Sequence, residues 1–281
     1  MARDLTRKHA DIGGLDIAYV DEGEGPAIVL IHGWPDSADL WRHQVPALVA
    51  AGHRVIAPDL RGFGDSAKPE AAEAYGIFDI VGDVNGLLDH LGVERCAVVG
   101  HDWGGMFAWV LGTFGAPRVE RLTSISVGHP GAFAAAGIRQ RQLSFYMTIF
   151  QFREIAEQWL SNDDWKNLRE WVTVGGHAAP DLDRWLEDLS RPGALTASLG
   201  PYRANVPPES LVSGAIEFPP VPVPTMGIMG TGDFALTVEQ MAGSAAHVAG
   251  EWRYEALDGK GHWLPVECAS EISRLLVDWH A

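Results

Sequence analysis

Short apolar runs alternate with segments of helical period over the first 130 residues of the chain. The runs predict strands at residues 15–20, 27–31, 54–57, 96–99 and 122–127. The run at 27–31 is apolar throughout, which is typical of a strand buried on both faces. Strands that alternate with helices form βαβ units, so we predict an α/β fold with a mostly parallel central sheet.

Segments of helical period separate these runs. Residues 107–114 predict one helix, and a second is predicted by Val81, Val84, Leu88 and Leu91. A third is expected to begin after Asp36 or Ser37, either of which can cap it. Its apolar face consists of Leu40, Trp41, Val45, Leu48 and Val49. In the predicted fold such helices cover both faces of the sheet.

The pattern changes near residue 131 and changes back near residue 219. Between these points the sequence predicts helices rich in Trp, Glu and Arg, and no convincing strand. The proline-rich stretch 218–224 cannot be a helix or a central strand, because proline lacks the N–H that either would use. Strands resume at 223–229 and 252–256, and a last helix carries Ile272, Leu275, Leu276 and Trp279.

This change of pattern predicts the domain organisation. Residues 1–130 and 219–281 form a core domain of the α/β type, and residues 131–218 form a helical lid inserted into it. An insertion of this kind is placed where a lid over an active site would be.

The composition suits such a domain and excludes some partners. Hydrophobic residues make up 47% and charged residues 21% of the 281, an ordinary globular balance. Lys and Arg number 21 and Asp and Glu 37, so the net charge is −16. Such a charge repels nucleic-acid phosphates and anionic membrane surfaces, so we expect neither as a partner. A homodimer is left open.

The cysteines and the N-terminal residues indicate a compartment. Cys96 and Cys268 are not in a C-x-x-C pair, and we predict buried thiols rather than a disulfide. The first residues lack the apolar core of a secretory signal, and no stretch approaches 18 consecutive apolar residues. We therefore expect a cytoplasmic protein.

The strongest chemical signal is the segment Gly100-His101-Asp102-Trp103-Gly104. An apolar strand runs into a Gly-x-Asp-x-Gly turn and then into a helix, which is the context of a nucleophile elbow. Glycines flank the nucleophile because the turn is tight. Asp102 takes the place of the usual serine. A carboxylate in this position attacks carbon and forms an alkyl ester. The alternative, that Asp102 only caps the helix, is much weaker.

A second signal is His32-Gly33-Trp34-Pro35, directly after a buried strand. A loop in this place can aim a backbone N–H at the site. We expect the N–H groups of Trp34 and Trp103 to form an oxyanion hole. It would stabilise the negative oxygen that develops when the ester is hydrolysed.

The third signal supplies a base and the acid that orients it. His262 is flanked by glycine in a loop after the last strand, so we predict that it is the general base. Asp233 follows the strand at 223–229, and we predict that it orients His262; the alternative is a simple Asx turn. The order nucleophile, acid, histidine is that of the α/β-hydrolase triad. The histidines are scattered without metal-ligand spacing, so no metal is expected.

Taken together, these segments resemble the α/β-hydrolase superfamily over nearly the whole chain. The segment Arg61-Gly62-Phe63-Gly64-Asp65-Ser66 also resembles that family's turn after its fourth strand. Aspartate at the elbow narrows the resemblance to epoxide hydrolases and haloalkane dehalogenases. Both form an alkyl ester on the aspartate and hydrolyse it with water activated by histidine.

Two tyrosines favour the epoxide hydrolases. The segments around Tyr146 and Tyr202 resemble the two lid segments that carry the catalytic tyrosines of that family. A phenol with a pKa near 10 stays protonated at neutral pH, so it can donate to an epoxide oxygen as the ring opens. The alternative for either tyrosine is a core aromatic residue.

Two further features disfavour the dehalogenases. Many of them have Asn where this chain has Trp34, and one group carries its relay acid after the strand at 122–127. Residues 122–153 contain no Asp or Glu, so that arrangement is excluded. Fluoroacetate dehalogenases typically have Arg after the nucleophile, where this chain has Trp103. Trp103 itself does not discriminate, because both families often carry it.

The resemblance implies an epoxide hydrolase that needs no cofactor and converts a small apolar or aromatic epoxide and water to a vicinal diol. A role in detoxification fits such an activity. A haloalkane dehalogenase with the same Asp, His and Asp remains the alternative. A non-catalytic receptor with the same fold is a third and weaker interpretation, because the catalytic residues expected of an enzyme are all present.

Overall fold

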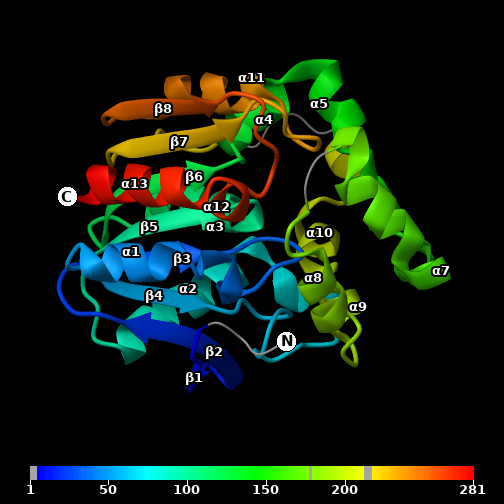
Figure 1. Cartoon of the computed structure of the whole chain (residues 1–281), viewed down its shortest axis with the longest axis horizontal. Helices are drawn as coiled ribbons and strands as arrows, with labels where there is room; N and C mark the ends of the chain where they lie inside the picture. The colour runs from blue at the N-terminus through cyan, green and yellow to red at the C-terminus, as the bar shows by residue number, and fades with distance from the viewer. Residues whose placement is uncertain (1–4, 177–178, 212–216) are drawn as a thin grey trace.

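A computed structural model describes residues 5–176, 179–211 and 217–281 of the chain. Its centre is one eight-stranded sheet with the strand order β1-β2-β4-β3-β5-β6-β7-β8 (Figure 1). β1 pairs antiparallel with β2, and β2 with β4, while all other neighbours are parallel. The strands are β1 (Lys8–Ile12), β2 (Leu15–Glu22), β3 (Ala27–Ile31), β4 (Arg54–Pro58), β5 (Cys96–His101), β6 (Val119–Ile125), β7 (Thr225–Gly230) and β8 (Trp252–Leu257).

The mostly parallel α/β sheet predicted from the apolar runs is confirmed. β3 and β7 are buried almost throughout, because helices cover both faces of the sheet. β1 was not predicted. It is an edge strand that buries only two of its five residues, so its sequence has no strong apolar pattern.

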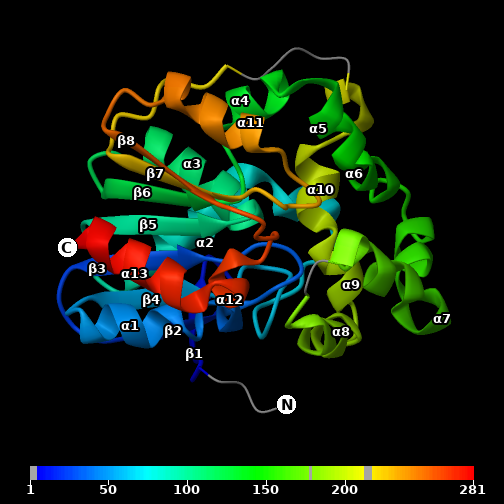
Figure 2. The ribbon, with the colours of Figure 1, turned by 45° about the horizontal axis from the view of Figure 1, so that its top comes forward.

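Helices pack on the two faces of this sheet. α1 (Gln44–Ala50), α12 (Leu264–Glu267) and α13 (Ala269–His280) lie on one face, and α2 (Ile77–His90) and α3 (Trp103–Phe114) lie on the other (Figures 1 and 2). The remaining elements of this part are η1 (Ala38–Trp41), η2 (Ala72–Tyr75), α11 (Val238–Ala242) and η5 (Gly243–His247). In the described residues, no helix is long and apolar enough to cross a membrane. Cys96 and Cys268 are buried and free, as predicted.

One predicted helix is divided in two. The segment after Ser37 forms the short 3₁₀ helix η1, and α1 begins only at Gln44. Ser37 caps η1 by accepting a hydrogen bond from the N–H of Asp39. Four residues of the predicted apolar face are nevertheless fully buried, and Val49 is half-buried; the four are Leu40, Trp41, Val45 and Leu48.

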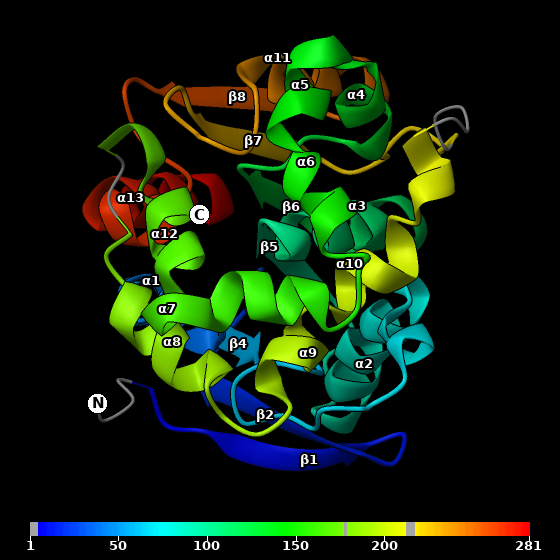
Figure 3. The ribbon, with the colours of Figure 1, turned by 90° about the vertical axis from the view of Figure 1, so that its right-hand side faces the viewer.

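The segment between β6 and β7 is helical in its described residues, which include no strand. It contains α4 (Pro130–Ala135), α5 (Gly137–Leu143), α6 (Phe145–Ile149), α7 (Ile155–Val172), η3 (Val174–Gly176), α8 (Leu182–Leu189), α9 (Ala194–Ser198), α10 (Gly200–Asn205) and η4 (Pro208–Leu211). Figure 3 shows this insertion from the front, with the sheet behind it. It lies over the edge of the sheet where β5 and β6 end, so it closes over the loops that carry the chemical motifs.

Candidate active site

Asp102 occupies a strained turn between β5 and α3. Its φ of 55° and ψ of −123° lie outside the regions that most residues adopt. A Cβ on Gly100 would overlap the carbonyl group of Gly104, and a Cβ on Gly104 would overlap that of Ile31. Within the described residues, the Asp102 side chain makes no capping hydrogen bond to α3. The capping interpretation is therefore wrong, and the carboxylate is directed elsewhere.

The carboxylate of Asp102 accepts a hydrogen bond from the loop after β3. The backbone N–H of Trp34 donates to Oδ1 at 2.7 Å, and the N–H of Trp103 lies near enough to lower the pKa of the carboxyl. Gly33 lies so close to Asp102 that a Cβ there would overlap the carboxylate. The two N–H groups named from the sequence thus converge on one side chain.

His32 fixes the shape of this loop from beneath. Its Nδ1 donates to the carbonyl of Gly33 at 2.9 Å, and its Nε2 accepts from the N–H of Leu60 at 3.0 Å. The ring is fully buried, and burial lowers its pKa. His32 therefore stays neutral and holds the Trp34 loop against the end of β4. Pro35 continues the loop after a cis peptide bond.

His262 lies between two carboxylates. Its Nδ1 is 2.7 Å from Oδ2 of Asp233, and its Nε2 is 3.6 Å from Oδ2 of Asp102. Oδ1 of Asp233 accepts hydrogen bonds from the N–H groups of Ala235 and Leu236, at 2.8 and 3.0 Å. Asp233 is thus both the Asx-turn residue of the weaker interpretation and the partner of His262. One oxygen shapes the turn, and the other orients the imidazole.

Burial and charge act in opposite directions on these groups. Burial lowers the pKa of His262, but the carboxylates of Asp233 and Asp102 outweigh it and raise the pKa to about 10. Burial raises the pKa of the Asp102 carboxyl, but His262 and the N–H of Trp103 hold it below its usual value. The site at neutral pH therefore contains an imidazolium between two carboxylates.

Two buried phenols from the insertion face the same carboxylate. Tyr146 on α6 and Tyr202 on α10 line, together with Asp102, both cavities of the site. Their ring centres are 5.9 Å apart. Burial and the nearby charge of Asp102 raise both pKa values well above 10. Both hydroxyls therefore stay protonated and can donate hydrogen bonds.

The helix that carries Tyr202 is fixed to the core. Oδ1 of Asn205 accepts from the N–H of Ile77 at 2.8 Å, and its amide donates to the carbonyl of Tyr75 at 2.9 Å. Gly200 presses against the ring of Tyr75, and a Cβ there would run into that ring. These contacts join both ends of α10 to η2 and the start of α2. They set the height of Tyr202 above the sheet.

Comparison with known proteins agrees with this geometry. The family described as the alpha/beta hydrolase fold matches residues 26–267. Epoxide hydrolase A of Mycobacterium tuberculosis is 32% identical over 98% of this chain and 97% of its own length. The chain belongs to the alpha/beta hydrolase fold family, among the epoxide hydrolases.

Solved structures of this family superpose closely. Epoxide hydrolase A from Mycobacterium thermoresistibile is 30% identical, with a TM-score of 0.83 over 97% of both chains. An epoxide hydrolase of Bacillus megaterium in complex with an inhibitor is 25% identical, with a TM-score of 0.85 over 96% of this chain and 99% of its own. The family's fold therefore extends through the insertion as well as the sheet.

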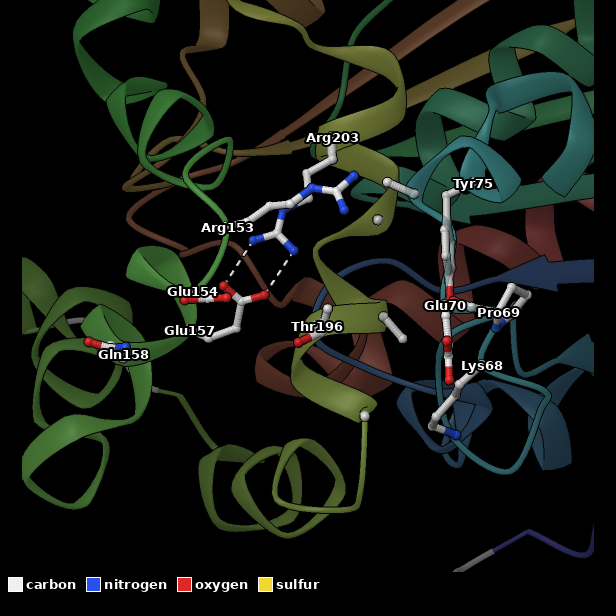
Figure 4. A pocket seen from close by; sticks show the side chains of 14 residues that line it. Lys68, Pro69, Glu70, Tyr75, Arg153, Glu154, Glu157, Gln158, Thr196 and Arg203 are labelled. Atoms are coloured by element: carbon white, nitrogen blue, oxygen red, sulfur yellow. Dashed lines mark hydrogen bonds and ion pairs between the residues drawn. The ribbon is translucent and has the colours of Figure 1, made fainter.

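A cavity larger than those at Asp102 lies outside the candidate active site. It has a volume of about 620 Å³ and lies among α7, α9, α10 and the segment before η2 (Figure 4). Charged side chains line it, including the ion pair of Arg203 with Glu157 at 2.8 Å. It contains none of Asp102, Asp233 and His262. α10 separates this cavity from the candidate active site. Arg203 on α10 lines this cavity, and Tyr202 on the same helix lines the cavities at Asp102.

Two residues that hold His262 have no role predicted from the sequence. The ring of His101 and the hydroxyl of Ser126 both donate to the carbonyl of His262, each at 2.9 Å. Burial lowers the pKa of His101 to about 4, so its ring is neutral and does not compete as a base. One feature of the sequence could have indicated the role of His101. It directly precedes the nucleophile at the end of a buried strand.

A buried network between insertion and core was also missed. Arg184 on α8 pairs with Asp36, which follows the Trp34 loop, at 2.7 Å. The indole N–H of Trp185 donates to the same carboxylate at 2.9 Å, and its ring packs on Trp263 at 4.5 Å. Because Trp263 follows His262, α8 contacts two of the loops that form the site. Residues 148 or 149 positions apart form the polar contacts, so no local pattern could have revealed them.

In the described ranges, no three His, Cys, Asp or Glu side chains are grouped so as to hold a metal ion. The groups gathered at Asp102 are instead suited to proton transfer and to nucleophilic attack. They comprise one carboxylate on a strained turn, an imidazole with its own acid, two backbone donors and two phenols.

Proposed function

We propose that the protein hydrolyses epoxides to vicinal diols through a covalent alkyl ester on Asp102. One observation carries this proposal. The Asp102 carboxylate faces His262 and the Trp34 N–H on one side, while Tyr146 and Tyr202 line the same cavities. Epoxide opening requires a nucleophile that attacks a ring carbon and an acid that protonates the ring oxygen. The carboxylate and the two neutral phenols supply both around the same cavities.

In the first step, a carboxylate oxygen of Asp102 attacks a ring carbon. The bond from that carbon to the epoxide oxygen breaks, and its electron pair remains on the oxygen. Tyr146 and Tyr202 donate hydrogen bonds to this oxygen, and one of them transfers its proton. The imidazolium of His262 then returns a proton to the tyrosinate. Holding the partners in place contributes about 7–11 kcal/mol to such a step.

In the second step, neutral His262 takes a proton from water, whose oxygen attacks the ester carbon. Esterification has removed the charge of Asp102, so only Asp233 still raises the pKa of His262. The negative oxygen of the intermediate lies on the N–H groups of Trp34 and Trp103. Collapse breaks the bond to the alkyl oxygen, which takes the remaining hydrogen of the attacking water and leaves as the diol. Asp102 is again a carboxylate and His262 an imidazolium, so the balance is one epoxide and one water to one diol.

We also propose a domain organisation, a cellular compartment and a physiological role. Residues 131–218 act as a lid that delivers the two tyrosines, and residues 1–130 with 219–281 act as the catalytic core. No cofactor takes part. The free, buried Cys96 and Cys268 support a reducing, cytoplasmic setting, and detoxification of reactive epoxides is the role we assign. A homodimer is compatible with this proposal.

The test is intact-protein mass spectrometry on His262→Gln incubated with propylene oxide. Without the base, ester formation outruns hydrolysis, so the protein should gain the whole mass of the epoxide. The gain should be absent in the double variant that also carries Asp102→Ala, and it should not accumulate on the wild type.

Two outcomes would contradict the proposal. A gain of only the alkyl group from 1-bromopropane, with none from the epoxide, would favour the dehalogenase. No adduct from either reagent, together with no diol formed by the wild type, would favour the receptor.

A further inference from the structure

Two cavities of very different size meet at Asp102. One has a volume of about 90 Å³ and the other about 10 Å³. Asp102, Tyr146 and Tyr202 line both of them. A three-membered ring held between the carboxylate and the phenols would therefore adjoin both cavities.

The larger cavity is apolar. Apart from Asp102, Trp103 and the two tyrosines, the described residues that line it are Met106, Val127, Phe133, Met147, Val206 and Leu236. The flexible thioethers of Met106 and Met147 can adjust to different hydrocarbon shapes. These six side chains suit an apolar substituent, because none of them has a charged or hydroxyl group that would hold water in its place.

The smaller cavity is enclosed by aromatic rings. Trp171 on α7 packs against Tyr146, Trp34 and Phe234, with ring centres at 4.7, 5.7 and 5.7 Å. Phe234 packs in turn on Trp263 at 5.6 Å. Rings locked against each other in this way cannot yield to a second substituent without repacking.

The polar groups of the smaller cavity suit one water. A volume of about 10 Å³ is the room that one water needs, and a water also needs two or more polar partners. His262 and the Asp102 carboxylate both line this cavity. A water there would lie beside the imidazole and the ester carbon that it attacks.

We propose that this asymmetry restricts the substrates to terminal epoxides, with apolar substituents on one ring carbon only. The inference rests on the proposed hydrolysis of epoxides. The substituted carbon faces the Met106 and Met147 side, and the CH₂ carbon faces the Trp171 side. A trans-1,2-disubstituted epoxide would have to place a carbon chain where the water belongs.

The first test compares isomers of equal size. 1,2-Epoxyhexane and trans-3,4-epoxyhexane have the same formula, but only the second carries a chain on both carbons. We expect kcat/KM of the wild type to be at least 100-fold higher for 1,2-epoxyhexane. Equal values would overturn the inference. Failure to convert these two and propylene oxide, with no ester in His262→Gln, would instead overturn the proposed function.

Variants of the two cavity walls sharpen the test. Trp171→Ala enlarges the smaller cavity and should raise the relative kcat/KM for trans-3,4-epoxyhexane at least tenfold. Trp165→Ala removes another indole from α7 that lines neither cavity, so it should leave the isomer ratio unchanged; Trp159 is unsuitable as this control because its ring packs on Trp171. An equal effect of both variants would overturn the inference.

A third variant tests the larger cavity in case Trp171→Ala does not fold. Phe133→Trp narrows that side, so it should lower kcat/KM for 1,2-epoxyhexane at least tenfold more than for propylene oxide. Equal losses for the two substrates would show that the substituent binds elsewhere, and would overturn the inference.

Discussion

The two halves of the site are built in different ways. In the core half, Asp102, His262 and the Trp34 loop sit at strand ends, and backbone hydrogen bonds fix them. In the insertion half, Tyr146 and Tyr202 sit on helices of five and six residues. Ring packing and a few polar contacts to the core hold these helices in place.

The core half supplies the charged reacting groups, and the insertion half sets the positions of the two phenols. Core residues carry the charge, and in the proposed reaction Asp102 and His262 form and break bonds or move protons in both steps. The phenols are neutral, and their effect depends on where the insertion places them above the carboxylate. Substitutions in the core half should therefore block a step of the reaction. Substitutions that move the insertion should change the distance from the two phenols to the substrate oxygen.

Asp233→Asn should have the largest effect, because it turns His262 to the wrong tautomer and removes the charge that raises its pKa. We expect ester hydrolysis to slow by about 10⁴-fold, as for the aspartate of a serine hydrolase triad. Ester formation should fall far less, so the ester accumulates. Rapid-quench mass spectrometry measures both steps. An equal loss in the two steps would show that Asp233 does not act through the base.

The double variant Tyr146→Phe with Tyr202→Phe should slow ester formation by about 10²–10⁴-fold, because the leaving oxygen loses its acid. Each single variant should lose less, since the other phenol remains. Burst experiments should show no accumulated ester, in contrast to Asp233→Asn. Tyr254→Phe is the matched control, since Tyr254 lies on β8 and lines neither cavity of the site, so its rates should equal those of the wild type. A double variant with the wild-type rate would refute the role of the insertion.

Asn205→Ala tests placement without touching a reacting group. Losing the hydrogen bonds to Ile77 at the start of α2 and to Tyr75 in η2 lets α10 shift, and a misplacement of this kind costs about tenfold to 100-fold in ester formation. Ester hydrolysis should not change, because the core half is intact. Asn205→Asp keeps the acceptor for the Ile77 N–H, so it should recover part of the rate. Equal losses in both steps would indicate a general loss of structure.

The remaining effect is on the stability of the protein at high pH and not on a reaction rate. The pKa of His262 is about 10 in the folded protein, against about 6.5 in an unfolded chain. The folded state therefore binds more protons between these values, so this stabilisation is complete below about pH 6.5 and is lost as pH rises through 10. The slope should be at most about 1.4 kcal/mol per pH unit. Denaturant unfolding from pH 7 to 10 should show a steeper loss for wild type than for His262→Gln. Parallel curves would show that the imidazole is not held as an imidazolium.

The sequence predicted the core half better than the insertion half. Asp102, His262 and Asp233 follow strands, and the glycines beside Asp102 and His262 mark tight loops, so local pattern was enough to name them. Tyr146 and Tyr202 were named only by resemblance, because short helices with aromatic residues look alike whether they line a site or a core. The roles of Asp36 and Asn205 depend on partners more than 120 positions away, which no local pattern encodes. The split of η1 from α1 was missed because the apolar face continues across it.

Because Gly200 is in contact with the ring of Tyr75, these two distant positions can be substituted only together. A side chain at 200 has no space while a tyrosine ring stands at 75, and a smaller residue at 75 alone would leave a void beneath α10. Libraries that randomise one of these positions should return almost only the wild-type residue. Libraries that randomise both should recover paired solutions, in which a larger residue at 200 comes with a smaller one at 75. Each such pair would change the position of Tyr202 relative to Asp102. Substrate preference could therefore be altered at positions 75 and 200 without changing any reacting group.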